Sequence, residues 1–315
     1  MIIVSLFDGL GNQMFQYAVA RHLAEKHSTA LKLDVSLYES EYKRTRKYGL
    51  HCFNIQENLA TQDEIRDILR LPRNKIESLR RKAIKYFGVS NGENNFFLQE
   101  DSFHFNPNIL ESPNNCYLFG YWQSEKYFAD IRDILRCEFS IKYPQDPQSE
   151  ALSEKIKSCE SIALHVRRGD YIQNQETYQH HGICSKDYYE RSMAYIVERT
   201  VNPYFFIFSD DPLWAKENLT NKFPSIVVEH NTGFRSYEDL RLMSQCKHNI
   251  IANSSFSWWG AWLNSNPDKI VCGPKHWFKN NISGTKYAFM EEAVPWYKDR
   301  FLDTKDLIPD GWIRF

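Results

Sequence analysis

Short apolar runs, each followed by a polar turn and then by a segment of helical periodicity, recur along this chain. Residues 2–7, IIVSLF, lead into the turn DGLGN, and segment 13–27 then places apolar residues on one helical face. We expect Asn12, the last residue of the turn, to cap that helix, because a short polar side chain there accepts a backbone N–H. Residues 161–166, SIALHV, run in the same way into 167–170. The pattern predicts two buried strands that each end in a polar turn.

The second half of the chain alternates strands with helices more regularly than the first half. Its predicted strands are 204–209, 226–230, 249–254 and 269–273, and its predicted helices open at Asp211-Pro212 and cover 235–246 and 255–265. The first half offers a helix at 61–71, a strand at 117–121 and a helix at 124–137. Strands separated by helices at this spacing favour βαβ units, so we expect the α/β class with parallel sheets.

A polar segment that contains two prolines, 140–150, divides the chain. We therefore expect an N-terminal domain over 1–145 and a C-terminal domain over 146–315, with the end of the chain packing back on the N-terminal domain. Two α/β halves of this size enclose a cleft, and ligands of such folds bind beyond the carboxyl ends of the strands.

Composition and charge exclude several classes of protein. Hydrophobic residues make up 42% of the 315 and charged residues 25%, which excludes a disordered or fibrous chain. The 39 basic and 40 acidic side chains nearly cancel, so we expect no nucleic-acid partner. No apolar run reaches the roughly 18 residues of a membrane helix, and no basic segment precedes the first apolar run as in a signal peptide. Seven scattered cysteines, none in a C-x-x-C pair, indicate free thiols, no zinc site and a cytoplasmic protein.

The segment HVRRGDY, 165–171, carries the strongest chemical signal. Arg167 and Arg168 directly follow a predicted strand. Two adjacent guanidinium groups there suit a diphosphate, which needs bidentate donors and permanent positive charge. Asp170 would hold one arginine in position, and His165 would donate to a base or a ribose. The alternative is an ion pair at a strand end with no ligand.

A pair of carboxylates, Asp210 and Asp211, follows the predicted strand 204–209 in the segment FSDDP. Such a pair binds a divalent metal, a sugar hydroxyl or the N–H edge of guanine. Asp211 followed by Pro212 is also typical of a helix N-cap and first turn. We expect Asp211 to combine capping with a ligand contact, and we expect no metal here.

Two further turns offer backbone N–H groups to a ligand. Residues 253–257, NSSFS, open a helix whose first N–H groups and hydroxyls form an anion site, although capping alone also explains them. The tryptophans of 258–262 are spaced for packing in the core. The turn 9–11 opens like a dinucleotide fingerprint, but Met14 stands where the third glycine belongs, so we expect no NAD site. Its glycines let the backbone approach a ligand closely.

A basic segment, 66–86, contains eight Arg or Lys and two acidic residues. Such a segment forms a solvated helix face, or it contacts an anionic membrane or a lipid-linked diphosphate. We therefore expect a cytoplasmic protein, with peripheral contact at the inner face of the membrane as an alternative.

Five segments, taken in order, resemble the motifs of the α-1,2-fucosyltransferases of glycosyltransferase family eleven. They are GLGNQMFQYAVARHLA from Gly9, FGYWQSEKYF (119–128), HVRRGDY (165–171), FSDDP (208–212) and NSSFSWWGAWL (253–263). The resemblance runs from about residue 4 to residue 275. Related sequences usually carry a small residue, often Gly, where this chain has Asp8, and the acidic group would affect the acceptor side.

The resemblance implies a GT-B fold, with two Rossmann-like domains whose parallel sheets face a cleft. It implies inverting transfer of L-fucose from GDP-β-L-fucose as co-substrate, with no metal and no other cofactor, in agreement with the absence of a D-x-D motif. Arg167 and Arg168 would neutralise the charge of the departing GDP, Asn12 would lie beside the reacting centre, and Asp170 would be a further catalytic residue. The implied donor-binding residues are Gly11, His165, Asp210, Asp211, Asn253, Ser254, Ser255 and Ser257.

Two features of the reaction stay open at this level. A base must accept the proton of the acceptor hydroxyl, and Asp8, Asp170 and His180 are the candidates. The expected acceptor is a terminal galactose of an oligosaccharide or lipid-linked glycan, whose C–H face would stack on Tyr121 and Trp122.

We therefore expect a galactoside 2-α-L-fucosyltransferase that acts in glycan or O-antigen biosynthesis. Two alternatives remain: a transferase that uses another GDP-sugar, such as GDP-mannose, and a glycan- or nucleotide-binding protein on an inactive transferase fold. The complete HVRRGD and FSDDP motifs favour an enzyme, because buried charges without a ligand are costly.

Overall fold

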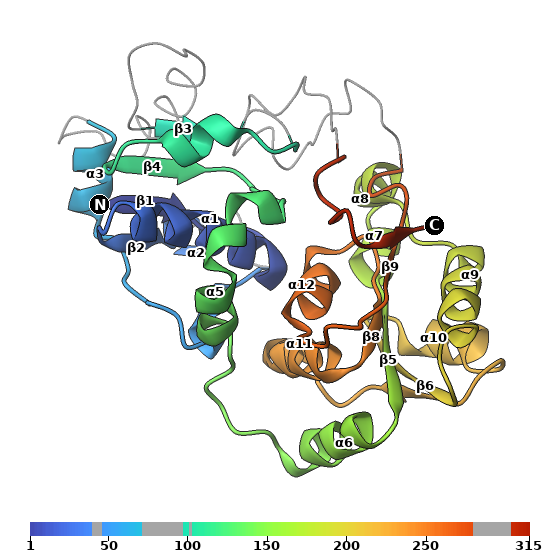
Figure 1. Cartoon of the computed structure of the whole chain (residues 1–315). Coiled ribbons are helices and arrows are strands. Elements are labelled where there is room, and N and C mark those ends of the chain that lie inside the picture. The colour runs from blue at the N-terminus through green and yellow to red at the C-terminus, as the bar shows by residue number, and fades with distance from the viewer. Residues whose placement is uncertain (40–45, 71–96, 101–102, 280–303) are drawn as a thin grey trace. The chain divides into compact units, whose positions relative to one another are not determined.

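The computed structural model describes residues 1–39, 46–70, 97–100, 103–279 and 304–315 (Figure 1). These residues form two units. The first contains Met1–Ser140 and the described part of Asn281–Leu307, and the second contains Ile141–Asn280 and Ile308–Phe315. The chain thus leaves the first unit at Ser140, earlier than the expected boundary after residue 145.

The first unit is built on a four-stranded parallel sheet with the order β2-β1-β4-β3. Its strands are β1 (Ile2–Ser5), β2 (Leu31–Asp34), β3 (Phe97–Gln99) and β4 (Cys116–Phe119). Its helices are α1 (Leu10–Lys26), α2 (Ser36–Glu39), α3 (Gln62–Ile68) and α5 (Arg132–Glu138), with 3-10 turns η2 (Leu50–Cys52), η3 (Pro107–Glu111), η4 (Glu125–Tyr127) and η5 (Ala129–Ile131). Every residue of the paired strands β1 and β4 is buried, so these strands form the centre of the sheet.

Two local predictions for the first unit are wrong. The helix expected at 124–137 is interrupted, because Phe128 adopts a φ of −147° and separates η4 from η5. Phe128 is fully buried and packs on the Phe15 ring at 6.0 Å between centroids, so burial of the ring decides the local backbone. Asn12 does not cap α1; Gly9 holds the N-cap position, and Asn12 lies inside the first turn.

The second unit is built on a six-stranded parallel sheet with the order β10-β9-β8-β5-β6-β7. Its strands are β5 (Glu160–Val166), β6 (Pro203–Ser209), β7 (Ser225–Val228), β8 (His248–Ile250), β9 (Val271–Gly273) and β10 (Ile313–Arg314). Its helices are α6 (Pro147–Ser158), α7 (Gly169–Gln173), α8 (Gln175–His181), α9 (Lys186–Val197), α10 (Pro212–Leu219), α11 (Ser236–Gln245) and α12 (Ser255–Leu263), with the 3-10 turn η6 (Gly233–Arg235). The four strands predicted after residue 200 are present, and β8 ends earlier than expected.

The strand β5 comes first in the second unit and lies in the middle of its sheet (Figure 1). The next strands, β6 and β7, extend the sheet on one side, and β8 and β9 extend it on the other. The strand order therefore reverses between β5 and β8, and ligands of open α/β sheets bind at such a reversal, beyond the carboxyl ends of the strands. The predicted α/β class is confirmed, with a parallel sheet in each of two units as in a GT-B protein.

The core of the second unit consists of aliphatic and aromatic side chains. Ile162 and Leu164 of β5 pack in one buried cluster with Met193 of α9. Trp258 and Trp262 stack at 6.3 Å between ring centroids and are buried, which confirms that the tryptophans of α12 are packing residues. All seven cysteines are free thiols, as predicted.

Within the described residues, no helix combines the length and the apolar composition that a membrane span requires. The basic segment 66–86, which was considered for membrane contact, lies outside the described residues from position 71 onward. Its described start belongs to α3 and the turn after it, and Arg66 forms an ion pair there with Asp63.

The turn after β4 depends on a buried carboxylate. Glu100 is 3% exposed, and its two oxygens accept the backbone N–H groups of Tyr121 at 2.6 Å and of Trp122 at 2.9 Å. A Cβ atom on Gly120 would lie 2.4 Å from the Glu100 Cβ and 2.9 Å from the Trp122 ring. Because neither neighbour is the free end of a flexible chain, this turn requires glycine at position 120.

We expect Gly120→Ala to lower the free energy of unfolding by about 1–3 kcal/mol, because the added methyl group overpacks a buried turn. Urea unfolding followed by tryptophan fluorescence measures the change. Gly311→Ala is the matched control, since a Cβ there meets no atom within 4 Å. Equal unfolding midpoints for the two variants would contradict this packing argument.

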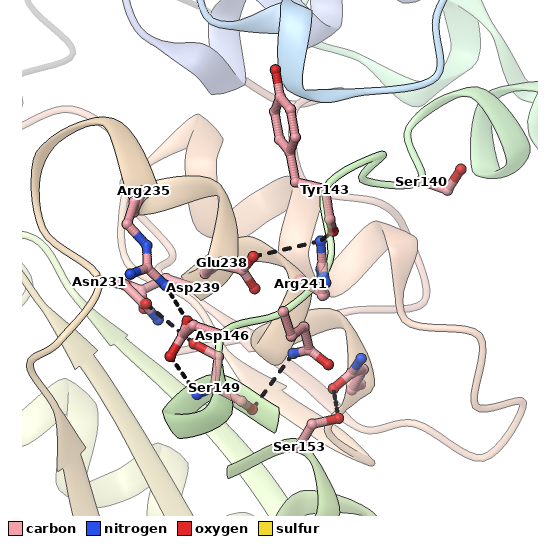
Figure 2. Close-up of polar contacts among 12 residues, drawn as sticks. Ser140, Tyr143, Asp146, Ser149, Ser153, Asn231, Arg235, Glu238, Asp239 and Arg241 are labelled. Atoms are coloured by element: carbon pink, nitrogen blue, oxygen red, sulfur yellow. Dashed lines mark hydrogen bonds and ion pairs between the residues drawn. The ribbon is translucent and has the colours of Figure 1, made fainter. Parts of the chain in front are cut away.

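The segment that opens the second unit is held by charged side chains (Figure 2). Asp146 accepts the backbone N–H of Ser149 at 3.1 Å, which caps α6, and it also forms an ion pair with Arg235. Arg241 donates from Nη2 to the carbonyl oxygen of Tyr143 at 2.5 Å. These contacts tie residues 143–149 to α11 and to η6.

Two acidic residues of α11, Glu238 and Asp239, lie beside these contacts (Figure 2). Glu238 is 1% exposed, and its Oε1 lies 3.5 Å from Arg241 Nη2. The Asp239 carboxylate accepts a hydrogen bond from Asn231 Nδ2 at 2.9 Å. Burial raises the pKa of Asp239 from 3.8 to about 7. The Glu238 charge raises this pKa further, whereas the hydrogen bond from Asn231 lowers it.

The raised pKa of Asp239 predicts a pH-dependent stability. The folded protein binds more protons here than the unfolded chain, so the stabilisation is complete below about pH 4 and is lost as the pH rises through 7. Asp239→Asn retains an acceptor oxygen for Asn231 but cannot ionise. We expect this variant to be more stable than the wild type at pH 8, on the order of 1–4 kcal/mol, and equally stable at pH 4.

Urea midpoints of both proteins at pH 4, 6 and 8 measure this difference. Glu154→Gln removes a carboxylate that is 70% exposed on α6 and serves as the control. If Asp239→Asn kept the pH dependence of the wild type, Asp239 would not be the group that titrates.

Candidate functional site

In the second unit, charged side chains gather where β5 and β6 end. The parallel register of these strands places Val166 opposite Ser209, so Arg167 and Asp210 leave the sheet side by side. The strand β8 ends on the other side of β5, and residues 251–254 lead from it into α12. This is the edge at which the strand order reverses and a ligand is expected.

Each arginine after β5 is paired with a carboxylate after β6. Arg167 Nη1 lies 3.1 Å from Asp210 Oδ2, and Arg168 Nε donates to Asp211 Oδ2 at 3.1 Å. The backbone N–H of Arg168 also donates to Asp210 Oδ1 at 2.8 Å. A Cβ atom on Gly169 would lie 3.0 Å from Asp210 Oδ2, so glycine leaves room for this carboxylate. The four charged groups therefore fix one another at the strand ends.

Two aromatic rings support the guanidinium groups. The Arg168 Cζ lies 4.1 Å from the centroid of the Trp214 ring, and the Arg167 Cζ lies 5.4 Å from that of Tyr171. Trp214 also donates its backbone N–H to Asp211 Oδ1 at 3.2 Å, so the predicted capping role of Asp211 is confirmed. Trp214 was not among the predicted site residues; its place three positions after the capping aspartate is the signal that identifies it.

His165 lies in β5, one residue before its end, and is 6% exposed. Burial lowers the pKa of this imidazole to about 4, with Asp210 opposing the shift and Arg167 adding to it. His165 is therefore neutral near pH 7, and its buried Nδ1 makes no hydrogen bond with any described residue. A neutral imidazole adds no charge to this edge but can exchange a hydrogen bond with a ligand.

The Asn253 side chain is committed to holding loops. Its Nδ2 donates to the carbonyl oxygens of His181 at 2.9 Å and Trp277 at 3.2 Å, and its Oδ1 accepts a weak hydrogen bond from Cys184 Sγ at 3.6 Å. Asn253 is 2% exposed. The structure thus gives this side chain a positioning role, and its expected contact with a donor stays a prediction.

The three predicted serines lie at the start of α12, and they differ in what their side chains do. Ser257 is 1% exposed and its hydroxyl accepts the Ala252 N–H at 3.2 Å, so it braces the turn after β8 from inside. Ser254 holds the N-cap position, and Ser255 is the first residue of the helix. A ligand at this end of α12 would meet Ser254 and Ser255 before Ser257.

The structure describes two carboxylates that steady the arginines. Asp210 and Asp211 hold the two guanidinium groups, and the expected role of Asp170 in holding one of them stays a prediction. The side chains of Asp170 and His180, two candidate bases, lie outside the described residues.

In the first unit, a second group of polar residues follows β1 and β4, which are adjacent and parallel. Tyr121 Oη donates to Asp8 Oδ2 at 2.6 Å, and Gln123 Nε2 donates to Asn12 Oδ1 at 2.9 Å. Gly11 is buried in the first turn of α1, between these residues in the sequence. The turn after β1 and the turn after β4 therefore join at one edge of this sheet.

The expected stacking of a sugar on Tyr121 and Trp122 is corrected by their burial. Trp122 is fully buried and meets the Tyr127 ring edge-on at 5.6 Å, while Tyr121 is 6% exposed and stacks on Phe103 at 5.8 Å. A sugar needs an exposed ring face, and the turn fixed by Glu100 directs both rings inward. Tyr121 can reach a ligand site only through its hydroxyl group.

Sequence comparison places these residues in a known family. The profile described as Glycosyl transferase family 11 matches residues 1–296. The chain is 32% identical to an alpha-1,2-colitosyltransferase from Escherichia coli over 325 aligned residues, covering 100% of this chain and 98% of that protein. It is 36% identical to the O-antigen biosynthesis glycosyltransferase WbnK from Escherichia coli over 294 residues, covering 88% and 94%. Among solved structures, fucosyltransferase NodZ from Bradyrhizobium is similar with a TM-score of 0.47 and 14% identity, over 82% of this chain and 91% of that chain.

The family match covers both groups of site residues described above, from Asp8 to Ser257. The alignments with the two Escherichia coli relatives cover 100% and 88% of this chain. The protein is therefore a glycosyltransferase, and the chain belongs to glycosyltransferase family 11.

Proposed function

We propose that this glycosyltransferase moves L-fucose from GDP-β-L-fucose to O2 of a terminal galactose, with inversion at the anomeric carbon. The observation that carries the proposal is the pair of guanidinium groups after β5, each held by a carboxylate from the end of β6. Two guanidinium groups that are held in place and permanently charged suit a donor whose leaving group is a diphosphate. The α-1,2 linkage in the name of the colitosyltransferase relative supports the same linkage here.

In the proposed reaction, acceptor O2 forms a bond to the anomeric carbon while the bond from that carbon to the β-phosphate oxygen breaks. GDP leaves with the electron pair of the broken bond, so negative charge grows on its phosphate. Arg167 and Arg168 stabilise this charge, and we propose that no metal ion is required. The acceptor proton passes to a base, for which Asp8, Asp170 and His180 are the candidates by sequence.

GDP-colitose is a second candidate donor, and one observation favours it. The relative named as a colitosyltransferase is 32% identical over the whole of this chain. Colitose is L-fucose without the 3-hydroxyl group, so the same diphosphate site would serve both donors. The name of the second relative favours an O-antigen repeat unit as the natural acceptor.

The donor is tested by GDP release from GDP-fucose, GDP-colitose and GDP-mannose, each with and without lactose or N-acetyllactosamine, in EDTA. We expect acceptor-dependent release from GDP-fucose, and an α-1,2 linkage in the product by NMR. A higher kcat/KM for GDP-colitose or GDP-mannose would reassign the sugar. Tight GDP binding with no release from any donor would favour a binding protein on this fold, and loss of activity in EDTA would contradict metal independence.

The diphosphate role of the arginines gives a quantitative prediction. We expect Arg167→Ala to lower kcat about 10²–10³-fold, equivalent to about 2.7–4 kcal/mol of transition-state stabilisation. Arg167→Lys keeps the charge but loses the bidentate fork, so we expect an intermediate rate.

The control is Arg199→Ala, which removes an arginine that is 44% exposed after α9, before the amino end of β6. All three variants are checked for folding by circular dichroism. A near-normal rate for a folded Arg167→Ala variant would contradict the phosphate role.

A further inference from the structure

Three of the four strands of the first unit lead directly to a carboxylate at the carboxyl edge of the sheet. Asp34 ends β2, Glu100 follows β3, and Asp8 follows β1 after a short turn. Ligands of such sheets bind at this edge, so each carboxylate is a candidate to contact a substrate. Their hydrogen bonds and burial distinguish them.

Asp34 and Glu100 have structural roles. Asp34 is fully buried and accepts hydrogen bonds from Tyr117 Oη at 2.6 Å and from the Ser36 backbone N–H at 3.0 Å. Glu100 is 3% exposed, and each of its oxygens accepts a backbone N–H, from Tyr121 and Trp122. Asp8 is half-buried, so of these three carboxylates it is the one that a ligand can reach.

The backbone of Asp8 is held in a conformation that favours glycine. Its φ is 62°, which costs a non-glycine residue about 1 kcal/mol or more. The Asp8 carbonyl oxygen accepts hydrogen bonds from Gln13 Nε2 and Tyr38 Oη, both at 2.9 Å. Gln13 is fully buried and also bonds to Lys47 and Gly49, so the turn that carries Asp8 is anchored to the neighbouring loop.

The Asp8 side chain is oriented by Tyr121. The Tyr121 hydroxyl donates to Asp8 Oδ2 at 2.6 Å, and its ring is fixed between Phe103 and Phe7, at 5.8 Å and 5.0 Å between centroids. This contact fixes the direction of one carboxylate oxygen, so the Asp8 carboxylate is held in place to accept hydrogen bonds from a ligand.

We propose that Asp8 is a specificity-determining residue that accepts a hydrogen bond from a hydroxyl group of the acceptor sugar, and that Tyr121 positions it. The inference rests on the proposed transfer to a galactoside and adds the group that selects this acceptor. Asn12, in the first turn of α1, is likewise held by a side chain that follows β4, since Gln123 donates to its Oδ1. A carboxylate and an amide that are held in place on adjacent strand ends are groups that orient a polyhydroxylated, uncharged sugar.

The test compares Asp8→Gly, Asp8→Asn and Tyr121→Phe with the wild type. Glycine adopts a φ of 62° without strain, so Asp8→Gly removes the carboxylate while the turn keeps its backbone conformation. Asp130→Asn is the matched control, since its carboxylate is 85% exposed in the same unit. The readouts are kcat and KM for lactose, GDP affinity by calorimetry, and lactose binding to the GDP-saturated protein by NMR, which needs no turnover.

We expect Asp8→Gly to raise the KM and the dissociation constant for lactose about tenfold to a hundredfold, the contribution of a hydrogen bond to a charged group. Asp8→Asn and Tyr121→Phe should raise them less, while GDP affinity stays close to wild type in all three variants. Unchanged lactose binding in Asp8→Gly would overturn the inference and leave the proposed transfer intact.

Two other results would also overturn it. If Asp8→Asn lost kcat at constant KM, together with the acidic limb of the pH–rate profile, Asp8 would be the catalytic base. If the wild type bound no galactoside, the proposed function would fail with the inference. If it bound galactosides but released no GDP, the proposed transfer alone would fail.

Discussion

The pairing of two arginines with two aspartates across the ends of β5 and β6 is the interaction on which the second unit's site depends. Guanidinium groups that follow a buried strand must find partners, and the parallel register supplies them from the next strand. Asp211 serves this pairing and the capping of α10 at once, and Trp214 of that helix covers the Arg168 guanidinium. Strand register, helix start and charge placement are thus coupled, so a ligand at this edge meets groups whose orientation is already set.

The same physical arrangement recurs in the first unit with different chemistry. Again the ends of two adjacent parallel strands are joined by side chains, here Tyr121 to Asp8 and Gln123 to Asn12. The second unit offers permanent positive charge, whereas this edge offers a carboxylate and an amide. The two edges therefore differ in chemistry, since one group suits phosphates and the other suits hydroxyl groups.

Much of this arrangement could be predicted from local pattern. The strands and helices after residue 200 follow from alternating apolar runs and turn residues, and the Asp211-Pro212 start of α10 follows from capping preference alone. The prediction of a helix over 124–137 is wrong because the periodicity of apolar residues does not show that Phe128 packs inward against Phe15. The prediction that Tyr121 and Trp122 stack on a sugar is wrong for the same reason. The local sequence does not distinguish an aromatic residue that packs in the core from one that stacks on a sugar.

The sequence by itself determined the α/β class, the order of the elements and the motifs that assign the family, because these depend on short-range periodicity, turn chemistry and residue identity. Only the tertiary structure decided which partners the charged groups take. Asp210 and Asp211 steady arginines that lie more than 40 residues away in the chain, and Asp8 is oriented by a tyrosine more than 110 residues away. Such contacts arise from strand order and register, which are set by the packing of the whole sheet, so no local segment of the sequence specifies them.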